Sequence, residues 1–307
     1  MTSISDSTQS LLKKHGYHLA GSHGAVKTCL WLNKSLRNEG ACYKSKFYGI
    51  TSHRCIQMTP TLVCNHRCLH CWRAIEMPVE VPKEWDSPHE IVESCLTEQR
   101  RLVSGYGGSG FMDKAKWKEA FEPRHVAISL SGEPTIYPYL PELIEEFHKK
   151  ELTTFVVTNG TNPEMVGKLK PTQLYISLNA PDRETYEKVC APLGDTWENI
   201  KQSLEVMKDS ETRTAVRITL TKGINMVNPE GFAHIIGHAE PDYVELKAYM
   251  HLGFSRKRLT LDNMPSHEEV REFSGKVAQA MGYCIADESE NSRVVLLSKD
   301  GAKRSIV

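Results

Sequence analysis

Three cysteines that follow an apolar segment constrain this chain more than any other feature. Cys64, Cys68 and Cys71, here called the loop triplet, come directly after the apolar, β-branched run 56–63, which has the composition of a strand. Thiolates at this spacing, in a loop after a strand, can ligate three irons of a cubane cluster and leave the fourth iron open for chemistry. A zinc site would need a fourth ligand, such as a nearby histidine, and structural zinc sites usually pair two separated ligand couples. The spacing therefore favours an iron-sulfur cluster over zinc or inert buried thiols.

Strand-like and helix-like segments alternate along much of the remaining chain. Apolar strand-like runs occur at 125–130, 153–158, 173–178, 215–220 and 243–247, and helical patterns occur at 139–149, 183–189, 197–208 and 229–238. With the run before the loop triplet, this pattern predicts six parallel strands joined by helices. We therefore expect an α/β fold of the partial (β/α)6 barrel type, with chemistry at the carboxyl ends of the strands.

An extension is expected on each side of the barrel. We assign 1–53 to a basic N-terminal extension that contains cysteines, 54–250 to the barrel and 251–307 to a C-terminal extension. The C-terminal extension should contain a helix at 266–281 and a strand at 294–298.

The N-terminal extension has no long periodic pattern between residues 21 and 53. We expect short elements over the mouth of the barrel, ordered by something other than a core of their own. Residues 1–10 are predicted to be disordered and 11–19 to form a short helix. Beyond the loop triplet, a capping signal predicts a helix at 89–103, and the glycine-rich stretch 105–110 indicates a flexible linker.

Charge is unevenly distributed although the net charge is zero. Residues 1–73 contain ten Lys or Arg and two acidic residues, so the remainder carries an equal excess of negative charge. This asymmetry suggests that a polyanion meets the end of the protein that holds the cysteines. The alternative is that the basic segment only neutralises bound clusters and their ligand.

The nine cysteines fit metal ligation in a reducing compartment better than a disulfide framework, since six of them lie between positions 29 and 71. The polar start shows no signal peptide, and no apolar run reaches about 18 residues. We therefore expect a cytoplasmic protein without membrane contact. The other three cysteines are Cys95, Cys190 and Cys284. We predict that they are ordinary, partly buried thiols that lie far from the six cysteines between positions 29 and 71.

Cys29, Cys42 and Cys55, here called the upstream triplet, recur at intervals of thirteen residues. A second cluster would order the basic segment around them, whereas buried or free thiols would leave that segment without support. The residue types alone leave both interpretations open.

Small and polar residues gather where the predicted strands end. Singly, such residues are typical of turns and helix caps, but several similar strand ends together predict a ligand site at one rim of the barrel. The candidate cofactor contacts are Ser131, Gly132, Glu133, Asn159, Ser177 and Asn179.

The loop triplet, with Trp72 after its last cysteine, resembles the signature of the radical S-adenosylmethionine (SAM) enzymes. The segment Ser131-Gly132-Glu133-Pro134 resembles their Gly-Gly-Glu-Pro motif, with Ser131 where the first glycine is usual. The resemblance implies that SAM binds the open iron through its amino and carboxylate groups. It also implies that an electron from the cluster cleaves SAM to a 5′-deoxyadenosyl radical.

A narrower resemblance covers nearly the whole chain. The archaeal tRNA 4-demethylwyosine synthases are similar to it in the upstream triplet and in the segments CNHRCLHCW, SLSGEP, VVTNG, YISLNAP and ELKAYMHLGFSRKRL. This resemblance implies a second 4Fe-4S cluster on the upstream triplet, and therefore two 4Fe-4S clusters in all. It also implies a lyase that converts 1-methylguanosine at position 37 of tRNA(Phe) to 4-demethylwyosine by condensation with pyruvate.

Lys44 stands two residues after the second upstream cysteine, where the family resemblance implies a Schiff base with pyruvate. An amine is nucleophilic only when neutral, and burial or a neighbouring cation such as Lys46 would lower its pKa, whereas an anionic cluster would oppose the shift. Without the resemblance, a solvated lysine in a basic segment is the more ordinary interpretation.

Arg256, Lys257 and Arg258 form a basic patch with aromatic neighbours, which we expect to line a groove for the tRNA anticodon loop. Alone, the patch would indicate a solvated turn. The eukaryotic relatives add a flavodoxin-like domain that this chain lacks, so we expect an external electron donor; we also expect a monomer. Two alternatives are a peptide-modifying radical SAM maturase and a non-catalytic, metal-stapled RNA-binding protein.

Overall fold

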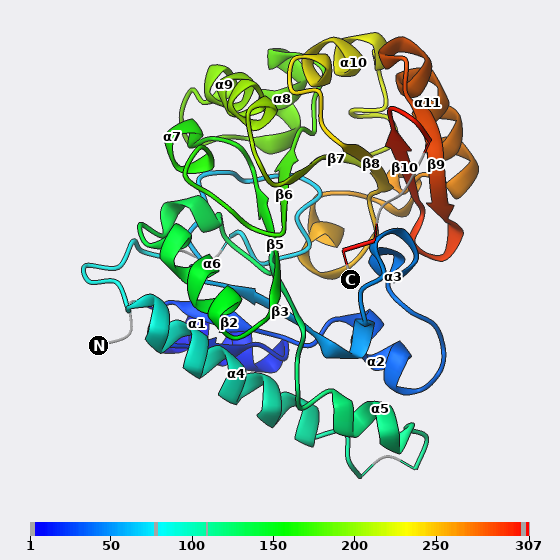
Figure 1. Cartoon of the computed structure of the whole chain (residues 1–307). Coiled ribbons are helices and arrows are strands. Elements are labelled where there is room, and N and C mark those ends of the chain that lie inside the picture. The colour runs from blue at the N-terminus through cyan, green and yellow to red at the C-terminus, as the bar shows by residue number, and fades with distance from the viewer. Residues whose placement is uncertain (1–3, 77–78, 109, 302–304, 307) are drawn as a thin grey trace.

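The computed structural model describes residues 4–76, 79–108, 110–301 and 305–306. Its described strands form one ten-stranded sheet in the order β1-β2-β3-β4-β5-β6-β7-β8-β10-β9 (Figure 1). The strands are β1 (His18–Ala20), β2 (Gly24–Val26), β3 (Cys55–Thr59), β4 (His125–Ile128), β5 (Thr153–Thr158), β6 (Gln173–Ser177), β7 (Arg213–Leu220), β8 (Tyr243–Ala248), β9 (Cys284–Ser289) and β10 (Val294–Ser298).

The helices surround this sheet, with α4 and α6 to α11 along its outer side (Figure 1). They are α1 (Asp6–Lys14), α2 (Leu30–Leu36), α3 (Tyr43–Tyr48), α4 (Pro88–Ser104), α5 (Lys114–Glu119), α6 (Leu140–Lys149), α7 (Pro163–Val166), α8 (Arg183–Cys190), α9 (Trp197–Lys208), α10 (Pro229–Gly237) and α11 (His267–Met281). Short 3-10 helices are η1 (Ser52–Arg54), η2 (Pro134–Ile136), η3 (Gly253–Lys257), η4 (Leu261–Asn263) and η5 (Glu290–Ser292). Among the described residues, no helix combines the length and apolar character needed to cross a membrane.

The six predicted parallel strands are confirmed as β3 to β8, which pair in chain order. The sheet ends at β1 and β9 and does not close, so the expected partial barrel is also confirmed. Successive residues of a strand face opposite sides. In β5, Val156 packs with the outer helices, whereas Phe155 and Val157 face the inside of the barrel.

Antiparallel strands from both extensions lengthen the sheet. The hairpin β1–β2 adds to β3, and β10 adds to β8 with β9 outside it. Only β10 was predicted, because β1 and β2 have three residues each and β9 contains no fully buried residue. The helix predicted at 11–19 is wrong in position: α1 begins at Asp6, after Ser5 caps it by accepting from the Thr8 amide, so part of the expected disordered start is helical.

The N-terminal extension is ordered by apolar packing against the barrel and not by a core of its own. Tyr43, Phe47 and Tyr48 of α3 are buried in an aromatic cluster with Phe155 and Tyr175 on the inner side of the sheet. Aromatic side chains of this size each bury a large apolar area. Helix α3 therefore fills part of the barrel interior, and this packing orders the extension.

Candidate active site

A cavity of about 790 Å³ collects the predicted site residues from the barrel and the N-terminal extension. Its lining includes the loop triplet, the upstream triplet, Lys44, Ser131, Gly132, Glu133, Asn159, Ser177 and Asn179. The basic patch 256–258 lies outside this lining. Two groups of cysteines that are separate in sequence therefore share one space with Lys44.

The loop triplet lies in an irregular segment that is fixed to the end of α8. The amide nitrogens of Arg67 and Leu69 donate to the carbonyl oxygens of Cys190 and Val189, at 3.0 and 2.9 Å. The Leu193 amide donates back to the loop at Asn65, at 2.9 Å. Paired backbone groups hold an irregular segment in place as effectively as they hold a strand. The position of the loop is thus determined by contacts distant in sequence.

Arg258 differs from the expected tRNA contact. Its guanidinium donates to the carbonyl oxygens of Leu69, at 3.2 Å, and of Cys71, and it pairs with Glu76. Only 15% of its side chain is exposed. Arg258 therefore supports the cysteine loop, whereas Arg256 and Lys257 are exposed.

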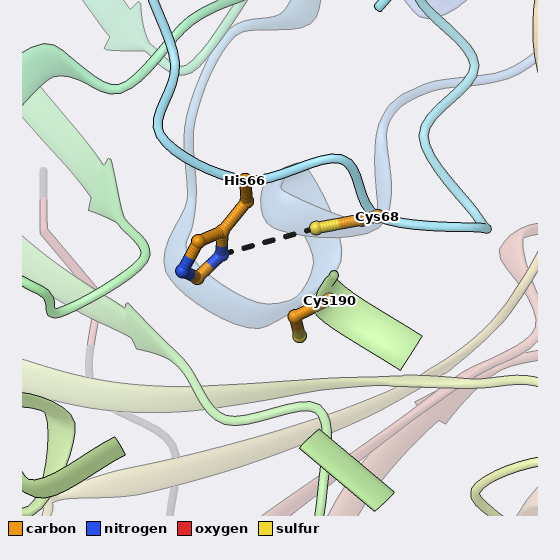
Figure 2. Close-up of side chains that lie close together, drawn as sticks. All are labelled: His66, Cys68 and Cys190. Carbon is orange, nitrogen blue, oxygen red and sulfur yellow. Dashed lines mark hydrogen bonds between the residues drawn. The ribbon is translucent and has the colours of Figure 1, made fainter. Parts of the chain in front are cut away.

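Cys190 corrects a second expectation, because it lies beside the loop triplet (Figure 2). Its Sγ atom, that of Cys68 and a ring nitrogen of His66 all lie within 4.8 Å of one another. Cys68 Sγ is 3.9 Å from His66 Nδ1, and the other ring nitrogen of His66 is 2.7 Å from the Tyr186 hydroxyl. The remaining two cysteines are not partly buried as predicted, since Cys95 is buried and Cys284 is exposed.

Burial disfavours the ionised form of two loop thiols, those of Cys64 and Cys68. It raises the pKa of Cys64 to about 12, and the nearby Glu133 and Cys68 add to the effect. A hydrogen bond with Cys190, together with burial, raises the pKa of Cys68 well above its ordinary value. Thiolates persist in such surroundings when a bound cation compensates their charge. The three partly buried cysteines of the loop triplet therefore fit a metal cluster.

Gly132 and Glu133 shape the rim next to the loop triplet. Gly132 has a φ of +67°, and a Cβ atom there would lie 2.2 Å from the carbonyl oxygen of Thr61, so only glycine fits. Ser131 is not among the residues with positive φ, so its departure from the usual glycine introduces no backbone strain. The Glu133 carboxylate is 2% exposed and accepts from the Thr158 hydroxyl at 2.5 Å.

The asparagines at the strand ends connect the rim with its surroundings. Asn159 Nδ2 donates to Asn65 Oδ1 at 2.8 Å, which links β5 to the cysteine loop. Asn179 Oδ1 accepts from the Thr219 amide at 2.8 Å, which links β6 to β7. Both residues also line the cavity, so each asparagine joins two parts of the fold and lies at the candidate site.

The upstream triplet converges from three separate elements. Cys29 precedes α2, Cys42 precedes α3 and Cys55 begins β3. Burial raises the pKa of all three thiols, that of Cys29 to about 11, and the thiols raise one another's pKa further: Cys42 acts on Cys29, and both act on Cys55. These mutual effects indicate that the three sulfur atoms lie near one another, as ligands of a common group would.

Lys44 lies on an aromatic floor. Its Nζ atom is 4.2 Å from the centroid of the Phe155 ring and 4.6 Å from that of Tyr175. Burial lowers the pKa of Lys44 to about 8, and Arg217 acts in the same direction, whereas Glu245 and the upstream thiols oppose the shift. The expected cation, Lys46, instead pairs with Asp287 at 2.7 Å. Arg217 is therefore the neighbouring cation that the sequence did not reveal.

A buried carboxylate beneath Lys44 was also missed. Glu245 is fully buried and accepts from Arg217 Nη2 at 2.7 Å, and from the hydroxyls of Tyr43, Tyr48 and Tyr175 at 3.0, 2.7 and 3.0 Å. Burial alone would raise the pKa of Glu245, but Arg217 and Lys44 hold it below its usual value. This network fixes α3, and with it Lys44, against the inner face of the sheet.

Two family profiles match adjacent parts of the chain. The radical SAM superfamily profile matches residues 58–236, and the wyosine base formation profile matches 238–299. The S-adenosyl-L-methionine-dependent tRNA 4-demethylwyosine synthase of Pyrococcus abyssi is 52% identical over 94% of this chain and 88% of its own. The protein of that name from Methanocaldococcus jannaschii is 42% identical over 98% of both chains. A solved structure of TYW1 with a lysine-pyruvate adduct bound matches 98% of both chains with 40% identity and a TM-score of 0.90.

Proposed function

The chain belongs to the radical SAM tRNA 4-demethylwyosine synthases, and we propose that it converts 1-methylguanosine at position 37 of tRNA(Phe) to 4-demethylwyosine with pyruvate as co-substrate. The observation that carries the proposal is the cavity in which both cysteine triplets and Lys44 meet. Such a concave site can hold two small substrates next to each other. No comparable observation favours a peptide maturase or a non-catalytic RNA-binding protein.

The loop triplet is the proposed holder of the 4Fe-4S cluster that the family uses with SAM. When bound, the cluster supplies the electron that cleaves SAM to the 5′-deoxyadenosyl radical, the species that takes hydrogen from the methyl group of the base. The chain's own contribution is orientation: Gly132 lets its turn pack directly against the backbone of residues 61–63, which lead into the cysteine loop, and Glu133 is held by Thr158. Ser131, Gly132, Glu133, Asn159, Ser177 and Asn179 are the proposed SAM contacts.

The upstream triplet is the proposed holder of a second 4Fe-4S cluster. Support comes from the convergence of three buried thiols that raise one another's pKa. A cubane bound by three cysteines again leaves one iron free, and pyruvate has a carboxylate and a carbonyl oxygen that can bind such an iron. Because Cys42 is two residues from Lys44, this arrangement would place pyruvate next to the amine.

Lys44 is the proposed covalent anchor of pyruvate. Its neutral amine adds to the ketone carbon, and loss of the carbonyl oxygen as water, with two protons taken from the nitrogen and the medium, leaves a protonated imine. Burial and the charge of Arg217 lower the pKa of Lys44, so that a useful fraction is neutral near physiological pH. The adduct in the related TYW1 structure supports this assignment.

The anticodon loop of tRNA is proposed to dock over the mouth of the cavity, with Arg256 and Lys257 as exposed phosphate contacts. We further propose that residues 1–53, 54–250 and 251–307 act as the three functional units. An external electron donor, a monomeric state and a cytoplasmic location stay predictions.

One reconstitution tests the whole proposal. Anaerobically prepared protein, with defined tRNA carrying 1-methylguanosine, should form the tricyclic base when SAM, pyruvate and a reductant are supplied, as seen by nucleoside mass spectrometry. Lys44→Arg keeps the charge but forms no imine, so it should make 5′-deoxyadenosine without tricyclic product. Tricyclic product from Lys44→Arg at the wild-type rate would exclude covalent capture by Lys44.

A further inference from the structure

Lys247, near the end of β8, is a second lysine that lines the same cavity as Lys44. Its Nζ atom lies 4.9 Å from the centroid of the Tyr43 ring and donates to the carbonyl oxygen of Ser292 at 3.2 Å. Across the described part of the chain, Lys247 makes no ion pair. An ammonium group carries three donor hydrogens, so Lys247 retains capacity for an anion.

Ser292 supplies a second, independent observation at the same place. It lies in η5, the turn between β9 and β10, and only 3% of it is exposed. Its hydroxyl has no hydrogen-bond partner among the described residues, although Ser292 lines the cavity. Buried hydroxyls are nearly always paired in folded proteins, so an unpaired one on a residue that lines a cavity indicates a partner that the chain itself does not supply.

Arg217, the other cation close to Lys44, is already paired. It donates through Nε and Nη2 to Glu245, at 3.0 and 2.7 Å. Three further cations that line the cavity donate to backbone carbonyl oxygens: Arg67, Arg73 and Lys27. Close to Lys44, Lys247 can therefore bind a small anion without breaking an ion pair.

Lys44 and Lys247 share their neighbours. Lys44 Nζ is 4.6 Å from the centroid of the Tyr175 ring, and the Arg217 guanidinium is 4.5 Å from the same centroid. Arg217 Nη2 also donates to the Tyr43 hydroxyl at 2.7 Å, and Lys247 lies over the Tyr43 ring. Both lysines lie near enough to Cys42 to lower the pKa of its thiol. A three-carbon molecule with a carbonyl at one position and a carboxylate at the next can contact two groups that share these neighbours.

We propose that Lys247 and Ser292 form a carboxylate subsite that orients the 2-oxo acid while Lys44 attacks its carbonyl carbon. The inference rests on the proposed function, because it takes Lys44 as the nucleophile and pyruvate as the substrate. The ammonium group donates to one carboxylate oxygen and the Ser292 hydroxyl donates to the other, and each oxygen keeps a lone pair with which it could also bind the iron of the second cluster. Fixing the carboxylate fixes the neighbouring carbonyl carbon, since a single bond separates them, and this favours attack from one direction.

The subsite explains why 2-oxo acids are selected over simple ketones. A ketone without a carboxylate would leave the Lys247 ammonium and the Ser292 hydroxyl unpaired in a buried place, which penalises its binding. Burial and Arg217 lower the pKa of Lys247 to about 8, and a bound carboxylate would favour its charged form. Through Ser292, the C-terminal extension contributes a hydroxyl to a site that is otherwise built by the barrel and α3.

Borohydride trapping with two carbonyl compounds tests the subsite. Pyruvate and hydroxyacetone both carry a methyl ketone, but hydroxyacetone has no carboxylate. In anaerobically prepared holoenzyme, Lys247→Met should reduce capture of subsaturating pyruvate by Lys44 roughly 10- to 100-fold, the effect of one charge-assisted hydrogen bond, and leave hydroxyacetone capture nearly unchanged. Ser292→Ala should reduce pyruvate capture by a smaller factor, and Lys247→Arg should recover part of it.

Lys276→Met is the matched control, because Lys276 lies on α11 and pairs only with Glu272 on the surface. It should capture both compounds as the wild type does. Equal losses for pyruvate and hydroxyacetone in Lys247→Met would overturn the proposal, since the lysine would then act on Lys44 and not on the carboxylate. A pyruvate adduct mapped to Lys247 would overturn it as well.

A binding measurement separates this inference from the proposed function. In a Lys44→Ala background, which forms no imine, equilibrium dialysis should show binding of labelled pyruvate that Lys247→Met weakens. If wild-type protein traps no pyruvate on Lys44 but this Lys247-dependent binding is found, the covalent step fails and the subsite stands. If the Lys247→Met change leaves pyruvate binding unaltered in protein that keeps its iron content and melting temperature, the subsite is refuted.

Discussion

Arg217→Met and Glu245→Gln should shift the pH dependence of pyruvate capture by Lys44 in opposite directions. Lys44 reacts only as the neutral amine, and Arg217 lowers its pKa whereas Glu245 raises it. Loss of the guanidinium therefore raises the pKa of Lys44 and lowers the neutral fraction at neutral pH. Loss of the carboxylate charge lowers that pKa and increases the neutral fraction.

The geometry gives the size of the effect. Lys44 Nζ and the Arg217 guanidinium carbon lie 4.6 and 4.5 Å from the centroid of the Tyr175 ring, so the two charges are at most about 9 Å apart. At an effective dielectric constant of about 20, unit charges at that separation interact by roughly 2 kcal/mol. About 1.4 kcal/mol corresponds to a tenfold change in the ratio of amine to ammonium. Arg217→Met should therefore slow capture at neutral pH by roughly tenfold or more and move its half-maximal rate to higher pH.

The assay is borohydride trapping of labelled pyruvate between about pH 6 and about pH 9.5, a range that spans the lowered pKa of Lys44, with the adduct located by peptide mass spectrometry. Lys46→Met is the control and should leave the profile in place, because Lys46 pairs with Asp287 away from the cavity. Glu245→Gln leaves Arg217 without its buried counter-charge, so its free energy of unfolding should fall by about 3 to 5 kcal/mol. The pH profile of the Glu245→Gln variant is therefore measured at a temperature where this variant stays folded. Shifts of the same sign in both variants, or no shift in either, would refute the electrostatic account.

Three further predictions concern the clusters and the rim. Replacing the loop triplet with alanine should abolish 5′-deoxyadenosine formation and leave about half of the iron, if each triplet holds one cubane; reductive cleavage of SAM by that variant would exclude the assignment. Replacing the upstream triplet should likewise halve the iron content, measured by colorimetry, and unchanged iron would rule out the second cluster. The N-terminal extension should stay largely resistant to protease in this variant, because the buried side chains of Tyr43, Phe47 and Tyr48 hold it against the barrel. Gly132→Ala should weaken SAM binding, measured by equilibrium dialysis, and should lower the free energy of unfolding by about 1 to 3 kcal/mol. The reason is that Gly132 has a φ of +67° and that the Thr61 carbonyl oxygen blocks a Cβ atom there. Ser131→Gly, in contrast, should change the free energy of unfolding by less than about 1 kcal/mol.

The parallel strands and the loop triplet were predictable because their signals are local. Strand β5 is a run of six β-branched or aromatic residues, and the cysteine spacing lies within one loop. Cys190 and Arg258 were misjudged because their partners lie far away in the sequence, on the cysteine loop. The periodic pattern of apolar residues in the sequence does not predict such contacts. They depend on how the chain folds to bring helix α8 and the 3-10 helix η3 next to the cysteine loop.

The charged residues inside the barrel had a signal that could have revealed them. Arg217 lies in β7 and Glu245 and Lys247 lie in β8, at positions that alternate with apolar residues. A parallel strand covered on both faces is normally apolar throughout. Charged residues on one face of two such strands therefore indicate a polar interior, and the register pairs Arg217 directly with Glu245.

The proposed nucleophile Lys44 beside proposed thiolate ligands presents an electrostatic difficulty that the network of Arg217, Glu245 and the tyrosines resolves. Negative charge near Lys44 favours its ammonium form, and the upstream thiols do raise its pKa. Arg217 opposes them, but a buried guanidinium needs a carboxylate, and Glu245 would by itself cancel the benefit. The hydroxyls of three tyrosines donate to Glu245, as Arg217 does, and stabilise its charge where it lies. Two of these tyrosines belong to α3, so the helix that carries Lys44 also supplies the donors that allow Arg217 to remain beside it.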